Sequence, residues 1–200
     1  MGQRLVVSIE SMGDCLAKLY FHWSAYTMSA LYQTKKIVNC IYDHNDETKE
    51  ELLLRLIKFC EANGGGIDGN ENEFNYIQGL YPNETFKKDG YSRNNGLIAL
   101  SQKGMEEMQR WSEGDVTIDI DEDEIHFEVY GWYESLLEYN EERAEWDEDW
   151  GNGIPMQDVP DIGYDLSCIA VDDIGAVLEA LSATNSHIIR YGNEIYELIE

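Results

Sequence analysis

The sequence predicts an α+β fold in which an antiparallel sheet, built from hairpins, carries two or more packed helices. Segments near both ends and in the middle alternate apolar and polar residues, as half-buried strands do. Between them, residues 24–42 and 45–62 repeat apolar side chains every three or four positions, as amphipathic helices do. The chain has 200 residues, 43% of them hydrophobic, which is enough for one domain over 1–200.

The first two strands are expected at 4–10 and 15–22, joined by a turn at 11–14 into a hairpin. A mostly buried helix follows from 24 to about 42, with the apolar stripe Ala30, Leu31, Ile37, Val38 and Ile41. Asn45 or Asp46 is expected to cap the next helix, which ends at Asn63 and the glycines that follow. Its buried face is expected to be Leu53, Leu56, Ile57 and Cys60.

The middle of the chain continues with a glycine-containing loop and a short helix or turn around 74–81 that Pro82 ends. A polar surface loop is expected over 83–95, a short strand at 97–100 and a helix at 102–111. Towards the C-terminus, a buried strand is expected at 166–171 and a helix capped by Asp172 reaches about Leu181. A hairpin over 187–199 completes the predicted sheet.

Charge is distributed unevenly along the chain. Residues 1–110 contain 12 Lys and Arg and 15 Asp and Glu, a net charge of −3. Residues 111–200 contain two Arg and 25 acids, a net charge of −23 within the total of −26. Such a field repels nucleic acid and anionic membranes and attracts basic proteins, so direct nucleic-acid binding and membrane binding are not expected.

The acidic half opens with a hairpin expected over 115–130. Apolar and polar residues alternate on both sides of the acidic segment 121–124, which predicts a half-buried antiparallel pair. A four-residue turn would place Ile118 opposite Phe127, and the acids would lie on the other face. His126 is expected to face Asp119 across this hairpin.

A helix is expected over 134–150, with the stripe Leu136, Tyr139, Arg143, Trp146 and Trp150 and acids on its other faces. Acids two apart on a strand lie about 6.6 Å apart, on the order of the phosphate spacing in a nucleic-acid strand. The residues expected to contact a partner are therefore Asp115, Asp119, Asp121, Glu122, Asp123, Glu124, Glu128, Glu138, Glu141, Glu142, Glu145, Asp147, Glu148 and Asp149, with the aromatics Trp132 and Tyr133. Trp146 and Trp150 fit either the core or the interface.

Motifs for catalysis, metals and cofactors are missing from the sequence. The four cysteines form no C-x-x-C pair, the four histidines are isolated, and the glycines 64–66 lack the lysine of a P-loop. The acids at 119, 121 and 123 suggest an EF-hand, but Glu124 occupies the required glycine position and Tyr130 the bidentate acid position. We expect no catalytic residue, no metal site, no cofactor and no enzymatic activity.

No signal peptide and no apolar run long enough to span a membrane is seen in the sequence, which predicts a cytoplasmic protein with free thiols. The opening MGQRLVVSIE, the stretch Phe21–Tyr26 (FHWSAY) and the acidic tail resemble small acidic bacteriophage proteins that counter host defence. That resemblance implies a nucleic-acid-mimicking inhibitor, of the anti-CRISPR or anti-restriction kind, acting in the host cytoplasm on a basic nucleic-acid-binding protein. The alternatives are an adaptor that binds through exposed aromatics and a metal-dependent hydrolase.

Overall fold

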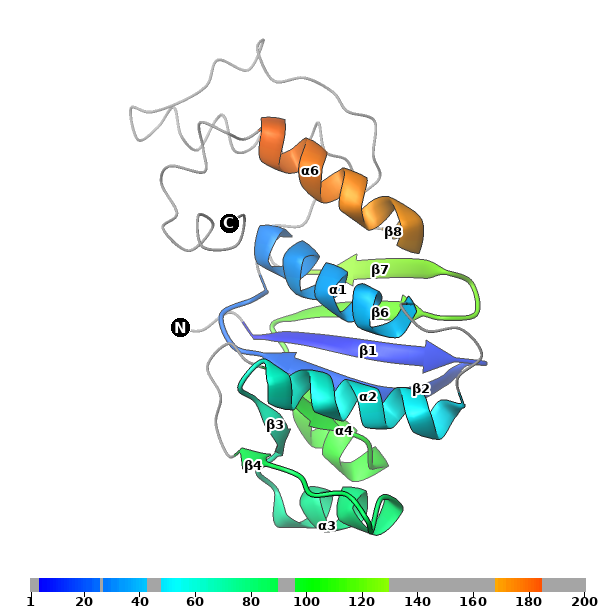
Figure 1. Ribbon diagram of the computed structural model, residues 1–200. Coiled ribbons are helices and arrows are strands. Elements are labelled where there is room, and N and C mark those ends of the chain that lie inside the picture. The colour runs from blue at the N-terminus through cyan, green and yellow to red at the C-terminus, as the bar shows by residue number, and fades with distance from the viewer. Residues whose placement is uncertain (1–3, 26, 43–47, 90–95, 130–167, 185–200) are drawn as a thin grey trace.

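A computed structural model describes residues 4–25, 27–42, 48–89, 96–129 and 168–184. These residues form one mixed sheet of eight strands in the order β4-β3-β5-β2-β1-β6-β7-β8, with helices packed against it (Figure 1). The α+β class is therefore confirmed. The expected purely antiparallel sheet is wrong, because several neighbouring strands are parallel.

The N-terminal hairpin is confirmed, with β1 at Leu5–Ser11 and β2 at Asp14–Phe21. Its two-residue turn needs positive φ at both positions, and Met12 and Gly13 have φ of 52° and 78°. The register shifts between Ile9 and Glu10, where Ile9 pairs with Ala17 and Glu10 with Cys15. This bulge lets Leu16 join the buried residues together with its neighbour Ala17.

Strand direction explains the error about the sheet. The strand β6 (Gly114–Asp119) lies parallel to β1, and β3 (Gly66–Asp68) lies parallel to both β4 (Lys88–Asp89) and β5 (Leu97–Ala99). Hydrophobic alternation does not encode the direction in which distant strands pair, and both β3 and β4 fall in segments expected to be loops. Because β2 is antiparallel to both β1 and β5, the strands β1, β3, β4, β5 and β6 all end at one edge of the sheet.

The parallel pair of β1 and β6 is held at its beginning by Arg4 and Glu113. The backbone carbonyl of Arg4 accepts hydrogen bonds from the N–H groups of Glu113 and Gly114 at 2.9 and 3.2 Å. In return, the Arg4 N–H and guanidinium each donate to the Glu113 carboxylate at 3.0 Å. These hydrogen bonds hold the pKa of Glu113 below its usual value.

Both faces of the sheet carry helices. The face with α1 (Thr27–Tyr42), α2 (Lys49–Ala62) and α6 (Ile174–Thr184) buries the larger core, which contains Leu5, Val7, Ile9, Val116, Ile118 and the expected stripes of the first two helices. The opposite face carries α4 (Gln102–Gln109), whose Met108 packs against Val6, Tyr20, Leu97 and Ala99. Figure 1 shows α1 and α2 in front of the strands and α4 behind them.

The ends of α2 show one error and one confirmation. The N-cap is Thr48 rather than Asn45 or Asp46, because Thr48 and Glu51 form a reciprocal capping box. The other end lies at the glycines, as expected: Gly64 has φ of 86°, and the Gly65 N–H donates to the Cys60 carbonyl at 2.8 Å.

The remaining elements lie close to their expected positions. The helix α3 spans Glu71–Leu80, capped by Asn70, and β8 spans Cys168–Ala170. Asp172 does not cap α6, because it lies within a short 3₁₀ turn, η2 (Val171–Asp173), whose N-cap is Ala170. Among the described residues, the four cysteines form no disulfide, and no helix is both long and apolar enough to cross a membrane.

The helix expected at 134–150 and the hairpin expected at 187–199 lie outside the described residues.

Candidate functional site

The acidic hairpin consists of β6 and β7 (Glu124–Glu128). Val116 and Ile118 on β6, and Ile125 and Phe127 on β7, are buried in the larger core, so the expected apolar face is confirmed. The expected register is wrong by two positions, because Ile118 lies opposite Ile125 and Asp119 opposite Glu124. The faces are preserved, since a shift of two residues keeps every side chain on its own side of the sheet.

The turn of this hairpin, residues 120–123, is tied to its surroundings by its own acids. The Asp119 carboxylate accepts from the N–H groups of Asp121 and Glu122 at 3.0 and 3.2 Å. The Asp121 carboxylate accepts from the Ser11 hydroxyl at 3.4 Å and from the Met12 N–H, which joins this turn to the β1–β2 turn. Backbone bonds from the Ile120 N–H to the Glu10 carbonyl and from the Val171 N–H to the Asp123 carbonyl add two further ties, 3.1 and 2.9 Å long.

Acids from three neighbouring strands form a row beside this turn. Glu10 on β1 pairs in register with Asp119 on β6, and Asp119 with Glu124 on β7. Asp119 and Glu124 alternate with buried residues and therefore lie on the sheet face opposite α1. Glu10 lies on the same face because it pairs in register with Asp119. Like charges that lie side by side on neighbouring strands lower the stability of the fold. An arrangement that lowers stability favours a role in binding over a structural role.

We call the residues of this row and turn, together with Glu128 on the same face, the acidic surface: Glu10, Asp119, Asp121, Glu122, Asp123, Glu124 and Glu128. The side chains of 121–124 and 128 are exposed, whereas Glu10 and Asp119 are half-buried.

Asp115 lies apart from the acidic surface although the sequence placed it there. It is half-buried and accepts hydrogen bonds from the Gln109 amide at 2.8 Å and the Ser112 hydroxyl at 2.9 Å. Gln109 also accepts from the Lys18 ammonium, which donates to Ser8 at 2.9 Å. Asp115 therefore belongs to a polar network beneath the C-terminal end of α4.

His126 does not face Asp119. Its partner across β6 is Thr117, and its Nε2 lies 3.4 Å from the Glu124 Oε2 on its own strand. On the other side, His126 pairs in register with Cys168 of β8. Glu124, His126 and Cys168 thus lie together on the open face of the sheet.

A small pocket of about 150 Å³ lies behind the acidic turn, lined by Tyr42, Asp123, Ala170, Val171 and Asp172. The Tyr42 hydroxyl donates to Asp123 Oδ1 at 3.0 Å and ties the end of α1 to the turn. Burial first, and then the Asp123 carboxylate, raise the pKa of Tyr42 well above its usual value.

We expect this tyrosine to make folding sensitive to alkaline pH. An unfolded tyrosine ionises near pH 10, at about its reference pKa. Since the folded pKa is higher, the contribution of Tyr42 to stability is complete below that pH and is lost as the pH rises towards the folded pKa. The difference in phenolate absorbance between the native protein and Tyr42→Phe should therefore show ionisation well above pH 10. Asp123→Asn should lower the pH at which Tyr42 ionises. Ionisation of native Tyr42 near pH 10 would show that its partly buried site does not raise its pKa.

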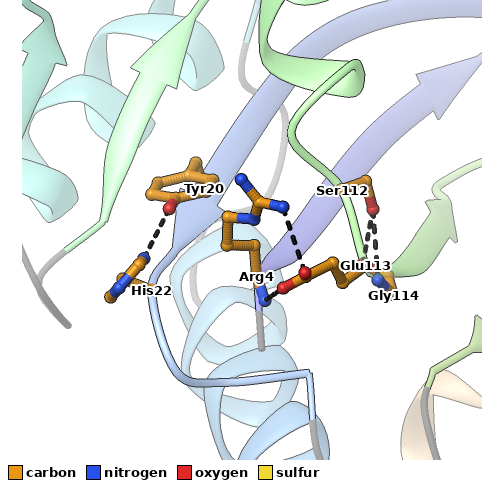
Figure 2. Close-up of polar contacts among 6 residues, drawn as sticks. All are labelled: Arg4, Tyr20, His22, Ser112, Glu113 and Gly114. Carbon is orange, nitrogen blue, oxygen red and sulfur yellow. Dashed lines mark hydrogen bonds and ion pairs between the residues drawn. The ribbon is translucent and has the colours of Figure 1, made fainter. Parts of the chain in front are cut away.

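An aromatic corner that the sequence did not predict as a site lies at the start of β1 and the end of β2. The Tyr20 hydroxyl and His22 Nδ1 are 2.7 Å apart, and Trp23 and Trp111 contact His22 and Tyr20 edge to face. Figure 2 shows Tyr20 and His22 beside the Arg4–Glu113 ion pair and the Ser112–Gly114 contact. Trp23 and Trp111 are 38% and 40% exposed. The one sequence signal for this corner is the run Phe21–Tyr26, which is rich in aromatic residues.

The other predicted partner-binding residues lie outside the described part of the chain: Trp132, Tyr133, Glu138, Glu141, Glu142, Glu145, Asp147, Glu148 and Asp149. The same holds for Trp146 and Trp150.

Comparisons with protein-family models, curated proteins and solved structures found no significant match to this chain.

Proposed function

We propose that this protein is an inhibitor that presents the acidic surface to a basic, nucleic-acid-binding groove of a host defence nuclease. The observation that carries the proposal is the row of Glu10, Asp119 and Glu124 on three adjacent strands, continued by the acids of the neighbouring turn. No substrate, metal or cofactor is needed for this role.

The spacing of these carboxylates suits a polyanion mimic. Neighbouring strands lie about 4.8 Å apart, and acids two apart on one strand lie about 6.6 Å apart. A lysine- or arginine-lined groove that tracks phosphates therefore meets negative charges at comparable intervals along two directions of the sheet.

The charge of this segment also supports the proposal. Residues 111–129 contain eight acids and no lysine or arginine. Neighbouring carboxylates with few cations between them produce a field that speeds encounter with a basic partner.

The acidic turn is preorganised for binding. Its hydrogen bonds to β1, to the β1–β2 turn, to α1 and to η2 fix the backbone of residues 120–123 before any partner arrives. A surface that is ordered in advance loses less conformational entropy on binding.

A second candidate is an adaptor that binds a partner through the aromatic corner. The exposure of Trp23 and Trp111 favours it, because tryptophans anchor many interfaces. The two sites lie at opposite ends of β1 and β2. The two functions also differ in salt dependence: an apolar contact retains its affinity in high salt, and an acidic surface does not.

The experiment begins with recovery of the partner from a host lysate on the immobilised protein, followed by mass spectrometry. DNA cleavage by a CRISPR effector nuclease and by a restriction endonuclease is then assayed with and without the protein. We expect inhibition of such a nuclease and a binding affinity that falls at least about tenfold between about 50 and about 500 mM salt. An affinity indifferent to salt would contradict the acidic-surface mechanism and favour the aromatic corner.

A further inference from the structure

Three potential metal ligands from two neighbouring strands converge on the open face of the sheet. One ligand atom each from Glu124, His126 and Cys168 lie within 4.8 Å of one another. Glu124 and His126 are two residues apart on β7 and therefore share a face, and Cys168 lies directly opposite His126 on β8. The topology of the sheet, rather than a sequence motif, brings them together.

We propose that Glu124, His126 and Cys168 form a binding site for a zinc ion. A thiolate, an imidazole nitrogen and a carboxylate oxygen are the three ligand types that zinc takes in proteins. Calcium and magnesium prefer all-oxygen ligands, so this set selects against them. With three protein ligands, the fourth tetrahedral position is available to water or to a small ligand.

The distances suit this ion. With ligand atoms about 2.1 Å from zinc, the corners of a tetrahedron are about 3.4 Å apart. The His126 Nε2 and Glu124 Oε2 are already 3.4 Å apart. Cys168 is within 4.8 Å of both, so a modest side-chain adjustment brings its sulfur to bonding distance.

Exposure and position indicate what the ion would do. The Glu124 and His126 side chains are 48% and 50% exposed, which leaves an entry path for the metal. The strand β8 is three residues long, is the last strand in the sheet order of the described residues, and is held to β7 by three register pairs. A zinc ion shared by β7 and β8 would fasten this short strand, together with η2 and α6 that follow it, to the rest of the sheet.

The site shares Glu124 with the acidic surface, but it does not rest on the proposed inhibitor function, because metal binding alone tests it. The experiment titrates the full-length, metal-free protein with Zn²⁺ by calorimetry and with Co²⁺ by absorbance. We expect one ion per chain, a rise in melting temperature, and a near-ultraviolet thiolate-to-cobalt charge-transfer band with visible bands typical of tetrahedral cobalt.

Variants assign the ligands. Cys168→Ser should abolish the charge-transfer band and weaken Zn²⁺ binding by about 100-fold or more, and His126→Ala should weaken it comparably. Cys168→His restores a nitrogen ligand and should recover much of the affinity without the band, which separates lost ligation from misfolding. Cys15→Ser and His22→Ala are matched controls outside the cluster, and they should bind zinc as the native protein does.

Unchanged binding in Cys168→Ser, or cobalt spectra typical of octahedral, all-oxygen coordination, would overturn the site. Millimolar or weaker binding by the native protein would overturn it as well.

Discussion

Replacing Glu73 with alanine should lower the free energy of unfolding by about 3 kcal/mol. Glu73 on α3 is 1% exposed, and its Oε1 accepts hydrogen bonds from the N–H groups of Leu100 and Ser101 at 2.6 and 3.0 Å. Its Oε2 accepts from the hydroxyl of Ser101, the N-cap of α4. Alanine would leave these donors unpaired and open a cavity at the start of α4.

The packing around Gly104 shows how closely this carboxylate fits. A Cβ at Gly104 would overlap the carboxylate of Glu73, so glycine in the first turn of α4 leaves the space that the carboxylate occupies. Because α4 bears Met108 and Gln109, its attachment also determines which part of the second sheet face is covered and which part stays open.

Urea unfolding followed by circular dichroism measures this change. Glu73→Gln keeps an acceptor for the two N–H groups and should cost about 1 kcal/mol. The matched control is Glu71→Gln, an exposed acid in the first turn of the same helix, which should cost about 0.5 kcal/mol or less. A Glu73→Ala loss no larger than that of the control would show that the buried carboxylate does not hold α4.

Local patterns predicted most of the elements but not their arrangement. The stripes of α1 and α2 and the alternation of β6 and β7 follow from the periods of helix and strand, so their buried faces could be read directly. The parallel pairing of β1 with β6 depends on contacts between residues more than a hundred positions apart, including Arg4 and Glu113. The short strands β3 and β4 are too brief to show alternation.

The register of the acidic hairpin could not be predicted for a related reason. Placing Ile118 opposite Phe127 or opposite Ile125 buries the same side chains, so alternation does not distinguish the two. Tertiary bonds accompany the observed choice: the Ile120 N–H donates to Glu10, and Asp119 accepts from the turn.

Much of the candidate site depends on the same long-range information. The acids of the hairpin were visible in the sequence, but Glu10, which extends their row onto β1, was not expected there. The cluster of Glu124, His126 and Cys168 requires the pairing of β7 with β8, and these strands are separated by about forty residues of sequence.

Neutralising Glu122, Glu124 and Glu128 together as glutamines should weaken binding of the partner by about 30-fold, if each carboxylate contributes about 0.7 kcal/mol. These three acids are exposed, and none of them bonds the backbone of the turn, so the fold should be retained. The dissociation constant, measured by biolayer interferometry at about 0.1 M salt, tests this expectation. Most of the loss should appear as slower association, because charge steers the encounter.

The matched control replaces Glu50, Glu71 and Glu106, three exposed acids outside the acidic surface, with glutamines. Both triple variants change the net charge by the same amount, so a purely nonspecific attraction to the acidic chain would weaken equally in both. If the partner instead recognises the shape and charge of the acidic surface, only the first variant should bind it more weakly. Equal losses of affinity in the two variants would show that the partner responds only to the overall charge of the protein. No loss in either variant would favour binding through the aromatic corner. A loss of affinity confined to the first variant is the result that the row of carboxylates across three strands requires.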